Sequence, residues 1–473
     1  MTGARPRNLA TPPAHPAAPA WVAAVHATRG PRYLAIAHAI RDALVSGQLK
    51  TGDRLPPQRE LARQLDVNLG TVTRAADALR SMGLVQGEVG RGTFLTAPAK
   101  ADAPASLWDH THPLDYIDLS HNFPEHAPSL AGAHALLTPP GRDDLQSLLA
   151  VQVDAGYATH RAAAAGWMQR RGIPATANEV IVTCGAQHGL LMALGALTRP
   201  GEIVLTEELT YYGLKSAASM LGRPIVGVRM DAQGLLPEAL DLAAQRSGAK
   251  VVFCCPTLHN PTTATMGRER RLALVEICRR RDLLIVEDDV YGMLPHEHLP
   301  TLASLAPERT VHVTGLSKLA GPGLRVGYIA APLEHTRALG VALRATTLMA
   351  PPMSAATALG VLEPENMARI VHAIQQETAA RLQIVAAHLP ASAVVARQGA
   401  FYFGLRVGAA WSAGAFAQAA DSLGIGVTPY DVFEGTPMVG GGLVRVCHNA
   451  APDHATLQRA LVGLRQLLET RPL

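Results

Sequence analysis

The chain has 473 residues, of which 48% are hydrophobic and 17% are charged. These proportions predict a globular protein with a large core, divided into about three domains or lobes, and they exclude an intrinsically disordered chain. No apolar run approaches the about 20 residues that a membrane helix needs, so we expect no membrane partner. The net charge of +4 is small, and only its distribution along the chain can indicate a partner.

The positive charge is concentrated near the N-terminus. Residues 29–95 hold ten Lys and Arg against six Asp and Glu, an excess equal to that of the whole chain. A small basic module of this kind is typical of nucleic-acid binding. Before it, Met1–Pro19 is rich in Pro and Ala and lacks the layout of a signal peptide, so we interpret residues 1–28 as a disordered tail.

The five cysteines show no spacing typical of a metal site, and we predict no bound metal. Cys254 and Cys255 lie in an apolar stretch that predicts a strand, which favours buried free thiols. Free thiols are typical of a reducing compartment, and we therefore expect a cytoplasmic protein.

Residues 29–97 predict a small domain that begins with three helices. Apolar residues recur at helical spacing from Pro31 to Leu49, and a second helix begins after Pro56-Pro57. Asn68 is suited to cap a third helix, because its side chain can accept a hydrogen bond from a free N–H group of the first turn. Helix, tight turn, helix is the layout of DNA-reading domains. The residues expected to face inward are Leu61, Leu65, Val72, Ala75, Ala76 and Leu79.

Two short apolar runs follow the third helix, Leu84-Val-Gln and Thr93-Phe-Leu. The segment between them, Glu88-Val-Gly-Arg91-Gly, has the composition of a turn. Together they predict a two-stranded wing with a basic tip, which completes a small α+β domain.

Four stretches of this domain carry a specific resemblance: Leu55-Pro-Pro-Gln-Arg-Glu-Leu-Ala-Arg-Gln-Leu, Thr71-Val-Thr-Arg-Ala, Leu79-Arg-Ser-Met-Gly-Leu and Gly90-Arg-Gly-Thr-Phe. They resemble the winged helix-turn-helix of GntR-type regulators over nearly all of residues 30–96. The resemblance implies that the partner is a double-stranded DNA operator.

The same resemblance implies which residues approach the DNA. Arg59, Thr71, Thr73 and the wing residue Arg91 are expected near phosphates and base edges. Position 69 departs from the pattern, because the family often has a basic residue where this chain has Leu69. One contact to a phosphate or a base is therefore expected to be missing.

The remainder of the chain predicts an α/β domain. Residues 98–115 are rich in Ala and Pro and predict a semi-stiff linker, and residues 116–473 follow it. From Glu179 onward, apolar strands alternate with helical stretches, which predicts a mostly parallel sheet covered by helices. The expected strands are Val180–Thr183, Ile203–Leu205, Val251–Cys255, Leu283–Glu287 and Thr310–Val313, and the expected helices include Gln187–Leu197 and Arg268–Arg280.

Several motifs fall at the carboxyl ends of these strands, where such sheets bind ligands. The turn Thr183-Cys-Gly185-Ala186-Gln187 can cradle a phosphate, although an ordinary strand–helix turn would have the same sequence. Tyr211 follows the next strand and could either stack on a flat cofactor or belong to the core. Asn260 could donate a hydrogen bond to a phenolate oxygen, and His259 is interpreted as a local hydrogen-bonding residue.

Asp288 and Tyr291 follow another strand. A carboxylate at a buried strand end needs a partner, and a protonated pyridine nitrogen is such a partner. Tyr291 could share the phenolate oxygen with Asn260. A metal site or a surface cluster of acids is the alternative, but no neighbouring His or Cys supports a metal.

The stretch Thr314-Gly-Leu-Ser317-Lys318 leads into a Gly-Pro-Gly corner that ends at Arg325. A lysine at the mouth of a strand can form an imine with a carbonyl once its pKa is lowered. An arginine nearby can bind a phosphate in fork geometry. A lysine imine and a phosphate clamp are what pyridoxal phosphate requires.

The order of these motifs resembles that of fold-type I aminotransferases from about residue 117 to the end. With the GntR-type head, the chain resembles the MocR subfamily of bacterial regulators. The resemblance implies a large domain with a mostly parallel sheet, a smaller α+β domain, pyridoxal 5'-phosphate and a head-to-tail homodimer. It implies that Lys318 forms the internal aldimine, that Asp288 faces the pyridine nitrogen, and that Arg445 binds the carboxylate of a substrate. The remaining cofactor contacts are implied at Gly185, Ala186, Gln187, Tyr211, Asn260, Tyr291, Ser317 and Arg325.

Two positions depart from the aminotransferase pattern. The family commonly has a hydroxyl residue where this chain has Gly315, and a tyrosine where it has Val151. Both positions help to hold phosphate in the enzymes, so their loss suggests weaker retention of the cofactor.

Three functions are consistent with these patterns. The first is a transcriptional regulator that holds pyridoxal phosphate on Lys318 and senses an amino-acid or amine ligand, or the cofactor itself. The second is a genuine aminotransferase with an accessory DNA-binding domain. The third is a DNA-binding dimer in which the cofactor site is a relic.

Overall fold

The computed structural model describes residues 21–22, 25, 32–45, 48–50, 52–81, 84–88, 92–95, 115–123, 131–137, 140–151, 155–408, 410–435 and 442–470. The chain divides into two compact units, Met1–Lys100 and Ala101–Leu473. Within the predicted tail, Trp21, Val22 and Val25 are helical and buried, unlike the disordered segment expected there. The rest of that tail, and the predicted linker apart from Asp115, lie outside the described residues. In the described part of the chain, no helix has the length and hydropathy to cross a membrane.

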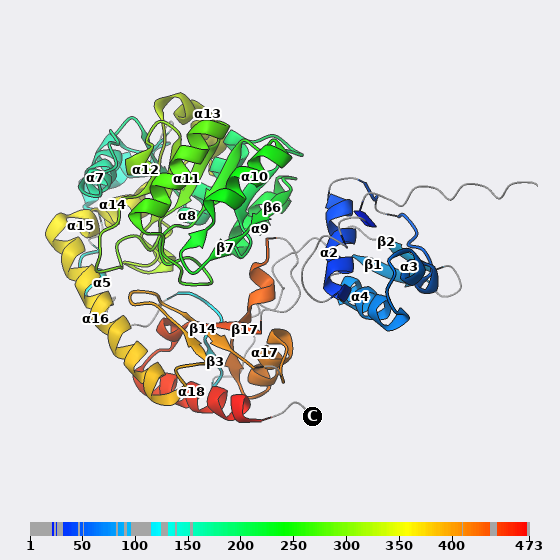
Figure 1. Cartoon of the computed structure of the whole chain (residues 1–473). Coiled ribbons are helices and arrows are strands. Elements are labelled where there is room, and N and C mark those ends of the chain that lie inside the picture. The colour runs from blue at the N-terminus through cyan, green and yellow to red at the C-terminus, as the bar shows by residue number, and fades with distance from the viewer. Residues whose placement is uncertain are drawn as a thin grey trace, which may run out of the picture. The chain divides into compact units, whose positions relative to one another are not determined.

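The first unit contains the predicted helices and wing (Figure 1). The six residues expected to face inward are all buried. Asn68 caps the third helix as predicted, because its Oδ1 accepts the N–H of Thr71 at 2.7 Å. The two wing strands pair antiparallel, from Val85 opposite Leu95 to Glu88 opposite Gly92. The elements are α2 (Arg32–Val45), α3 (Gln58–Gln64), α4 (Leu69–Ser81), β1 (Val85–Glu88) and β2 (Gly92–Leu95).

The second unit has a large lobe built on a seven-stranded sheet of order β4-β12-β11-β10-β9-β5-β6. All neighbouring pairs are parallel except those of β12, which runs antiparallel to β11 and β4. The strands are β4 (Val180–Thr183), β5 (Val204–Glu207), β6 (Ile225–Val228), β9 (Val251–Cys254), β10 (Leu284–Asp288), β11 (Thr310–Gly315) and β12 (Gly327–Ala330), with a hairpin of β7 (Met230–Asp231) and β8 (Gly234–Leu235) beside them.

Helices cover both faces of this sheet, which explains why its strands are continuous apolar runs. Val251 and Phe253 of β9 pack with residues of α8, α9 and α13. Val252 and Cys254 pack on the other face with residues of α10, α11 and α12. The helices of the lobe are α5 (Ala131–His134), α6 (Arg142–Leu148), α7 (Ala158–Arg170), α8 (Ala186–Leu197), α9 (Tyr212–Met220), α10 (Pro237–Ser247), α11 (Arg268–Arg281), α12 (Leu302–Leu305), α13 (Leu333–Thr347), α14 (Pro352–Thr357) and α15 (Leu359–Leu362).

All the strands and both helices that the sequence predicted are present, with each end within two residues of its expected position. Two strands of the sheet were missed, β6 and β12. In β12 the alternation of Gly327, Tyr328, Ile329 and Ala330 is too short and too rich in small residues to give a strand signal. The structure shows why Gly327 is small, since a Cβ atom there would lie 2.5 Å from the carbonyl carbon of Gly185.

The small lobe completes the second unit. The long helix α16 (Pro364–His388), yellow in Figure 1, runs from the large lobe into the small one and packs on α18. The main sheet has the order β13-β14-β17-β16, and β3 pairs with β15 beside it. The elements are β3 (Ile117–Asp118), β13 (Val394–Val395), β14 (Phe403–Arg406), β15 (Ile425–Gly426), β16 (Thr428–Pro429), β17 (Leu443–Val446), α17 (Ala413–Ser422) and α18 (His454–Glu469).

Candidate cofactor site and DNA-binding helices

Lys318 lies in the turn after β11, and its side chain is almost completely buried. Its Nζ donates a hydrogen bond to the main-chain oxygen of Asn122 and lies 4.6 Å from the centre of the Phe123 ring and 5.7 Å from that of Tyr291. Burial lowers the pKa of Lys318 to about 7, because the charged ammonium loses its hydration there. Near neutral pH, a substantial fraction of a lysine with this pKa is the neutral amine, which can attack a carbonyl.

Asp288 ends β10 on the face of the sheet opposite Glu287 and Asp289, because successive strand residues alternate. Burial raises the pKa of Asp288 to about 7, and the positive charge of Lys318 opposes that rise. No guanidinium or ammonium group among the described residues forms an ion pair with Asp288. The carboxylate can therefore accept a cationic partner, such as the protonated ring nitrogen expected from the sequence.

Arg445 on β17 is fully buried, so it is not a charge on the surface of the small lobe. Its guanidinium donates to Asn260 Oδ1 at 2.7 Å and to the main-chain oxygen of Ser120 at 2.6 Å, and it lies 4.6 Å from the centre of the Phe433 ring. Its Nε has no partner. In the part of the chain that the structure describes, no carboxylate pairs with this guanidinium, so it can bind an anionic group.

The predicted phosphate residues meet where α8 begins. Gly185 has a φ of 83°, and a Cβ atom there would lie 2.9 Å from the guanidinium of Arg325. That guanidinium donates to Cys184 O at 3.0 Å and is exposed. Ala186 begins the helix. The main-chain N–H groups of this first turn and Arg325 therefore lie together, as a phosphate site requires.

Gln187, Tyr211 and Ser317 complete the list of predicted cofactor residues. Gln187 donates to Gly213 O at 2.8 Å, and its buried Oε1 has no partner. The ring of Tyr211 also lies against Gly213, and burial raises the Tyr211 pKa, with further contributions from Tyr212 and Asp288. Ser317 is half-buried in the turn next to Lys318.

Three residues of the site were missed, all in the segment that follows β3. Asn122 accepts from Lys318 and donates from Nδ2 to the Tyr291 hydroxyl at 2.5 Å. Phe123 covers Lys318, and Ser120 accepts from Arg445. The sequence marked this stretch only as the start of a domain, since its polar residues follow a very short strand.

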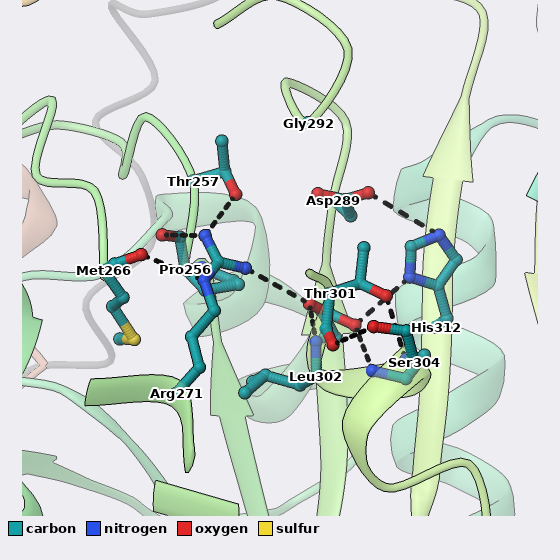
Figure 2. Close-up of polar contacts among 12 residues, drawn as sticks. Pro256, Thr257, Met266, Arg271, Asp289, Gly292, Thr301, Leu302, Ser304 and His312 are labelled. Atoms are coloured by element: carbon teal, nitrogen blue, oxygen red, sulfur yellow. Dashed lines mark hydrogen bonds and ion pairs between the residues drawn. The ribbon is translucent and has the colours of Figure 1, made fainter. Parts of the chain in front are cut away.

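A network of buried charges lies on the other face of β10. The Glu287 carboxylate accepts the N–H groups of Leu302 at 2.7 Å and Ala303 at 2.9 Å, and lies 4.0 Å from Arg271 and 3.3 Å from His312. Asp289 pairs with Arg171 and His312. Figure 2 shows Arg271 reaching the loop at Pro256, Thr257 and Met266, and His312 reaching Asp289.

Because Pro256 and Thr257 lead directly into the segment that carries Asn260, the network ties that segment to β10, which carries Asp288. The described residues contain no group of acids, histidines and cysteines arranged to hold a metal ion.

In the first unit, the structure places most of the predicted DNA contacts on α3 and α4. Arg59 and Thr73 are exposed, and Thr71 is half-buried. Leu69 is exposed at the start of α4. Arg91 lies outside the described residues. Helices α3 and α4 form the predicted helix-turn-helix, whose second helix enters the major groove of DNA in such domains.

The two units match two families. Residues 115–464 match the family of class I and II aminotransferases, and residues 32–95 match the bacterial regulatory proteins of the gntR family. The fold and the site therefore define a helix-turn-helix transcriptional regulator whose second domain is aminotransferase-like. The chain belongs to the regulators of this MocR-type architecture.

Among its relatives are three helix-turn-helix regulators. YdeF of Bacillus subtilis is 28% identical over 95% of this chain and 97% of its own length. TauR of Rhodobacter capsulatus is 31% identical, over 66% of this chain and 70% of its own. The pyridoxine biosynthesis regulator PdxR of Corynebacterium glutamicum is 30% identical, over 63% and 66%.

Solved structures of aminotransferases share the fold of the second unit. An archaeal alanine:glyoxylate aminotransferase has a TM-score of 0.68 at 22% identity, covering 79% of this chain and 96% of that one. LysN of Thermus thermophilus, solved with N-(5'-phosphopyridoxyl)-L-leucine, also has a TM-score of 0.68 at 22% identity, covering 78% and 94%. Domains of this family typically bind pyridoxal phosphate.

The residues of the site fit this cofactor. A buried lysine with a lowered pKa, a carboxylate without a cationic partner and a helix N-terminus with an arginine match its aldehyde, ring nitrogen and phosphate. The unpartnered Gln187 Oε1 and Asn122 Oδ1 are further polar atoms that a bound group could satisfy.

Covalent binding of pyridoxal phosphate is expected to speed up with rising pH and to level off above about pH 7, because Lys318 titrates there. An ordinary lysine, with a pKa of about 10.4, would still gain about tenfold per pH unit at pH 9. The measurement is the rate at which the visible band forms between pH 6 and 9. In an Asp288→Asn variant, the midpoint of this pH dependence should lie at or below that of the wild type, because the charge of Asp288 raises the Lys318 pKa. A wild-type rate that still climbs tenfold between pH 8 and 9 would contradict the lowered pKa.

Proposed function

We propose that this protein is a DNA-binding transcriptional regulator that holds pyridoxal phosphate on Lys318 and senses an amino acid or an amine, or the cofactor itself, in the cytoplasm. The observation that carries the proposal is the meeting of Lys318, Asp288 and Arg445 in one site of a chain with a GntR-type domain. The name of the pyridoxine biosynthesis regulator PdxR is consistent with a regulator that responds to the cofactor.

Each residue of the site has a task that its surroundings support. Pyridoxal phosphate supplies an aldehyde that condenses with amines and a ring that accepts electrons. Lys318 would offer the amine that holds the aldehyde, and an amine ligand would compete with Lys318 for it. Asp288 would keep a proton on the ring nitrogen, and the Arg445 fork would bind the carboxylate of an amino-acid ligand.

Binding at this site has to reach the DNA-binding domain. With its Nζ free, Lys318 donates to the main-chain oxygen of Asn122 and lies near the Phe123 and Tyr291 rings. Bonding of Nζ to the cofactor would remove this hydrogen bond, and displacement of Lys318 by a ligand would restore it. The loss and return of this contact with the 120–123 segment would shift the balance between two arrangements of the proposed head-to-tail homodimer and so the spacing of its DNA-binding domains.

A second candidate function is a genuine aminotransferase with an accessory DNA-binding domain. The observation that favours it is that lysine, aspartate, asparagine, tyrosine and arginine are all present for the chemistry, in a chain whose larger domain matches the aminotransferase family. Repeated release of a keto acid would distinguish it from a sensor.

The test is a visible absorption titration of the purified protein with pyridoxal phosphate and then with a panel of amino acids and amines. Keto acid and operator binding are measured in parallel. A cofactor band that shifts with one ligand and changes DNA binding without repeated keto-acid release supports the sensor. A protein that never binds the cofactor would show that the site is a relic.

Lys318→Ala is expected to lose the cofactor band and the ligand-dependent change in DNA binding, while DNA binding without ligand persists. The matched control is Lys215→Ala. Lys215 is half-buried, its pKa is likewise lowered mainly by burial, and it donates to Val432 O at 2.8 Å. The control should keep both responses. A full ligand-dependent DNA response in Lys318→Ala would contradict the proposed role of Lys318.

A further inference from the structure

We propose that Leu69 reads the 5-methyl group of a thymine in the operator. The inference rests on DNA binding by the GntR-type domain, and it adds a residue that determines sequence specificity. Leu69 is the first residue of α4, the second helix of the helix-turn-helix. Leu69 is 43% exposed, so it is accessible to a bound DNA.

The rest of the first turn of α4 offers few groups that could hydrogen-bond to bases. The Thr71 hydroxyl donates to Asn68 Oδ1 at 2.8 Å, and the same oxygen accepts the Thr71 N–H. The Thr73 hydroxyl donates to Gln58 Oε1 at 3.0 Å or to the Leu69 main-chain oxygen at 3.1 Å. Both hydroxyl hydrogens are therefore used inside the domain.

The nearest basic side chain on this helix is also occupied. Arg74 is exposed, and its guanidinium lies 4.2 Å from the centre of the Tyr33 ring, on α2. A cation held over a ring in this way is suited to a phosphate beside the groove rather than to a base edge. Gly70, next to Leu69, has no side chain that could shield the leucine.

Leu69 is therefore the apolar side chain that this end of α4 offers to the major groove, beside the exposed amide of Asn68. Among the four base pairs, only those with thymine show an apolar group there, the 5-methyl group. A leucine beside that methyl group removes both from water, whereas a leucine beside the amino group or the oxygen of another base would desolvate a polar atom without replacing its hydrogen bond. The geometry points to thymine as the preferred base opposite Leu69.

The experiment uses the full-length protein and duplex DNA that this protein selects from a random-sequence pool. A series of duplexes is then made, each with one thymine replaced by uracil, which lacks the 5-methyl group but keeps the same hydrogen-bonding groups. Binding is measured by fluorescence anisotropy at one fixed salt concentration, since salt alone changes such affinities.

One of these replacements is expected to weaken binding of the wild type by about fourfold, which corresponds to the about 0.8 kcal/mol for burying one methyl-sized group. The same replacement should have no effect on Leu69→Ala. In Leu69→Arg, a new selection should replace that thymine with guanine, because arginine pairs with the guanine edge. The matched control is Leu423→Ala, an exposed leucine of the second unit, which should keep the fourfold effect.

Three outcomes would overturn the proposal. Wild-type binding could be insensitive to every uracil replacement. Leu69→Ala could keep the sensitivity of the wild type, which would assign the methyl contact to another residue, such as Thr73. Selection of no DNA at all would overturn the proposed regulatory function, and this proposal with it. Because Leu69 is exposed, its variants should unfold at the temperature of the wild type, which separates lost contacts from lost structure.

Discussion

Replacing Glu287 by alanine is expected to destabilise the second unit by about 3–5 kcal/mol, because it removes one partner from a buried network of charges. The Glu287 side chain is fully buried and accepts two main-chain N–H groups at the start of α12. Without it, those N–H groups would be left unpaired away from water, and the Arg271 guanidinium, whose Nη1 has no hydrogen bond even in the intact protein, would lose its ion pair with Glu287. Urea unfolding followed by far-ultraviolet circular dichroism measures the loss.

The matched control is Glu308→Ala. Glu308 also accepts a hydrogen bond from an arginine, Arg279 at 2.9 Å, but both side chains are about half exposed. Exposed pairs of this kind contribute at most about 1 kcal/mol. If the two alanine variants lost similar amounts of stability, the prediction that the buried network stabilises the fold more than an exposed ion pair would be wrong.

The Glu287 effect should also depend on pH in a defined direction. Burial alone would raise the pKa of Glu287, but the hydrogen bond and charge of His312 and the charge of Arg271 outweigh it and hold that pKa below its usual value. The folded protein therefore binds this proton less tightly than the unfolded chain. The stabilisation is present above the unfolded pKa of about 4.3 and is lost as the pH falls through the folded value. The difference in free energy of unfolding between the wild type and Glu287→Ala should therefore become smaller at acidic pH.

Much of this fold could be predicted because its strands are buried on both faces. That environment turns strands such as Val180–Thr183 and Val251–Cys254 into uninterrupted apolar runs. The residues at their carboxyl ends are then brought together by the parallel sheet itself. Lys318, Asp288 and Arg325 are candidates from the sequence for that reason, although only the fold shows that Lys318 and Asp288 influence each other's pKa.

Other features leave no local pattern in the sequence. Asn122 and Lys318 are 196 residues apart, and their contact depends on how the segment after β3 crosses the site. The charge network draws on Arg271 in a helix, Glu287 in a strand and Arg171 just after a helix, all in ordinary stretches of sequence. The resemblance to GntR-type domains indicated Thr71 and Thr73, but their hydroxyl partners within the domain appear only in the structure.

Arg445→Ala is expected to weaken binding of the responding amino acid by about 10- to 150-fold, the equivalent of about 1.5–3 kcal/mol for a hydrogen-bonded charge pair. The ligand to use is the amino acid that gives the largest shift of the cofactor band, measured beside the amine that its decarboxylation would give. The amine lacks the carboxylate, so its binding should change little in the variant. Spectral titration of both ligands with wild type and variant measures the effect.

Arg445 also donates to Asn260 and Ser120, so its loss could act through the structure of the site rather than through a ligand. In that case the amino acid and the amine would lose affinity equally, and the proposed carboxylate contact would be wrong. Arg445→Lys should recover part of the affinity for the amino acid, because a lysine keeps the charge but not the fork. Arg406→Ala, on the neighbouring strand β14, removes an exposed arginine and should leave both ligands unaffected. A carboxylate-specific loss confined to Arg445 would identify the signal as an amino acid rather than an amine.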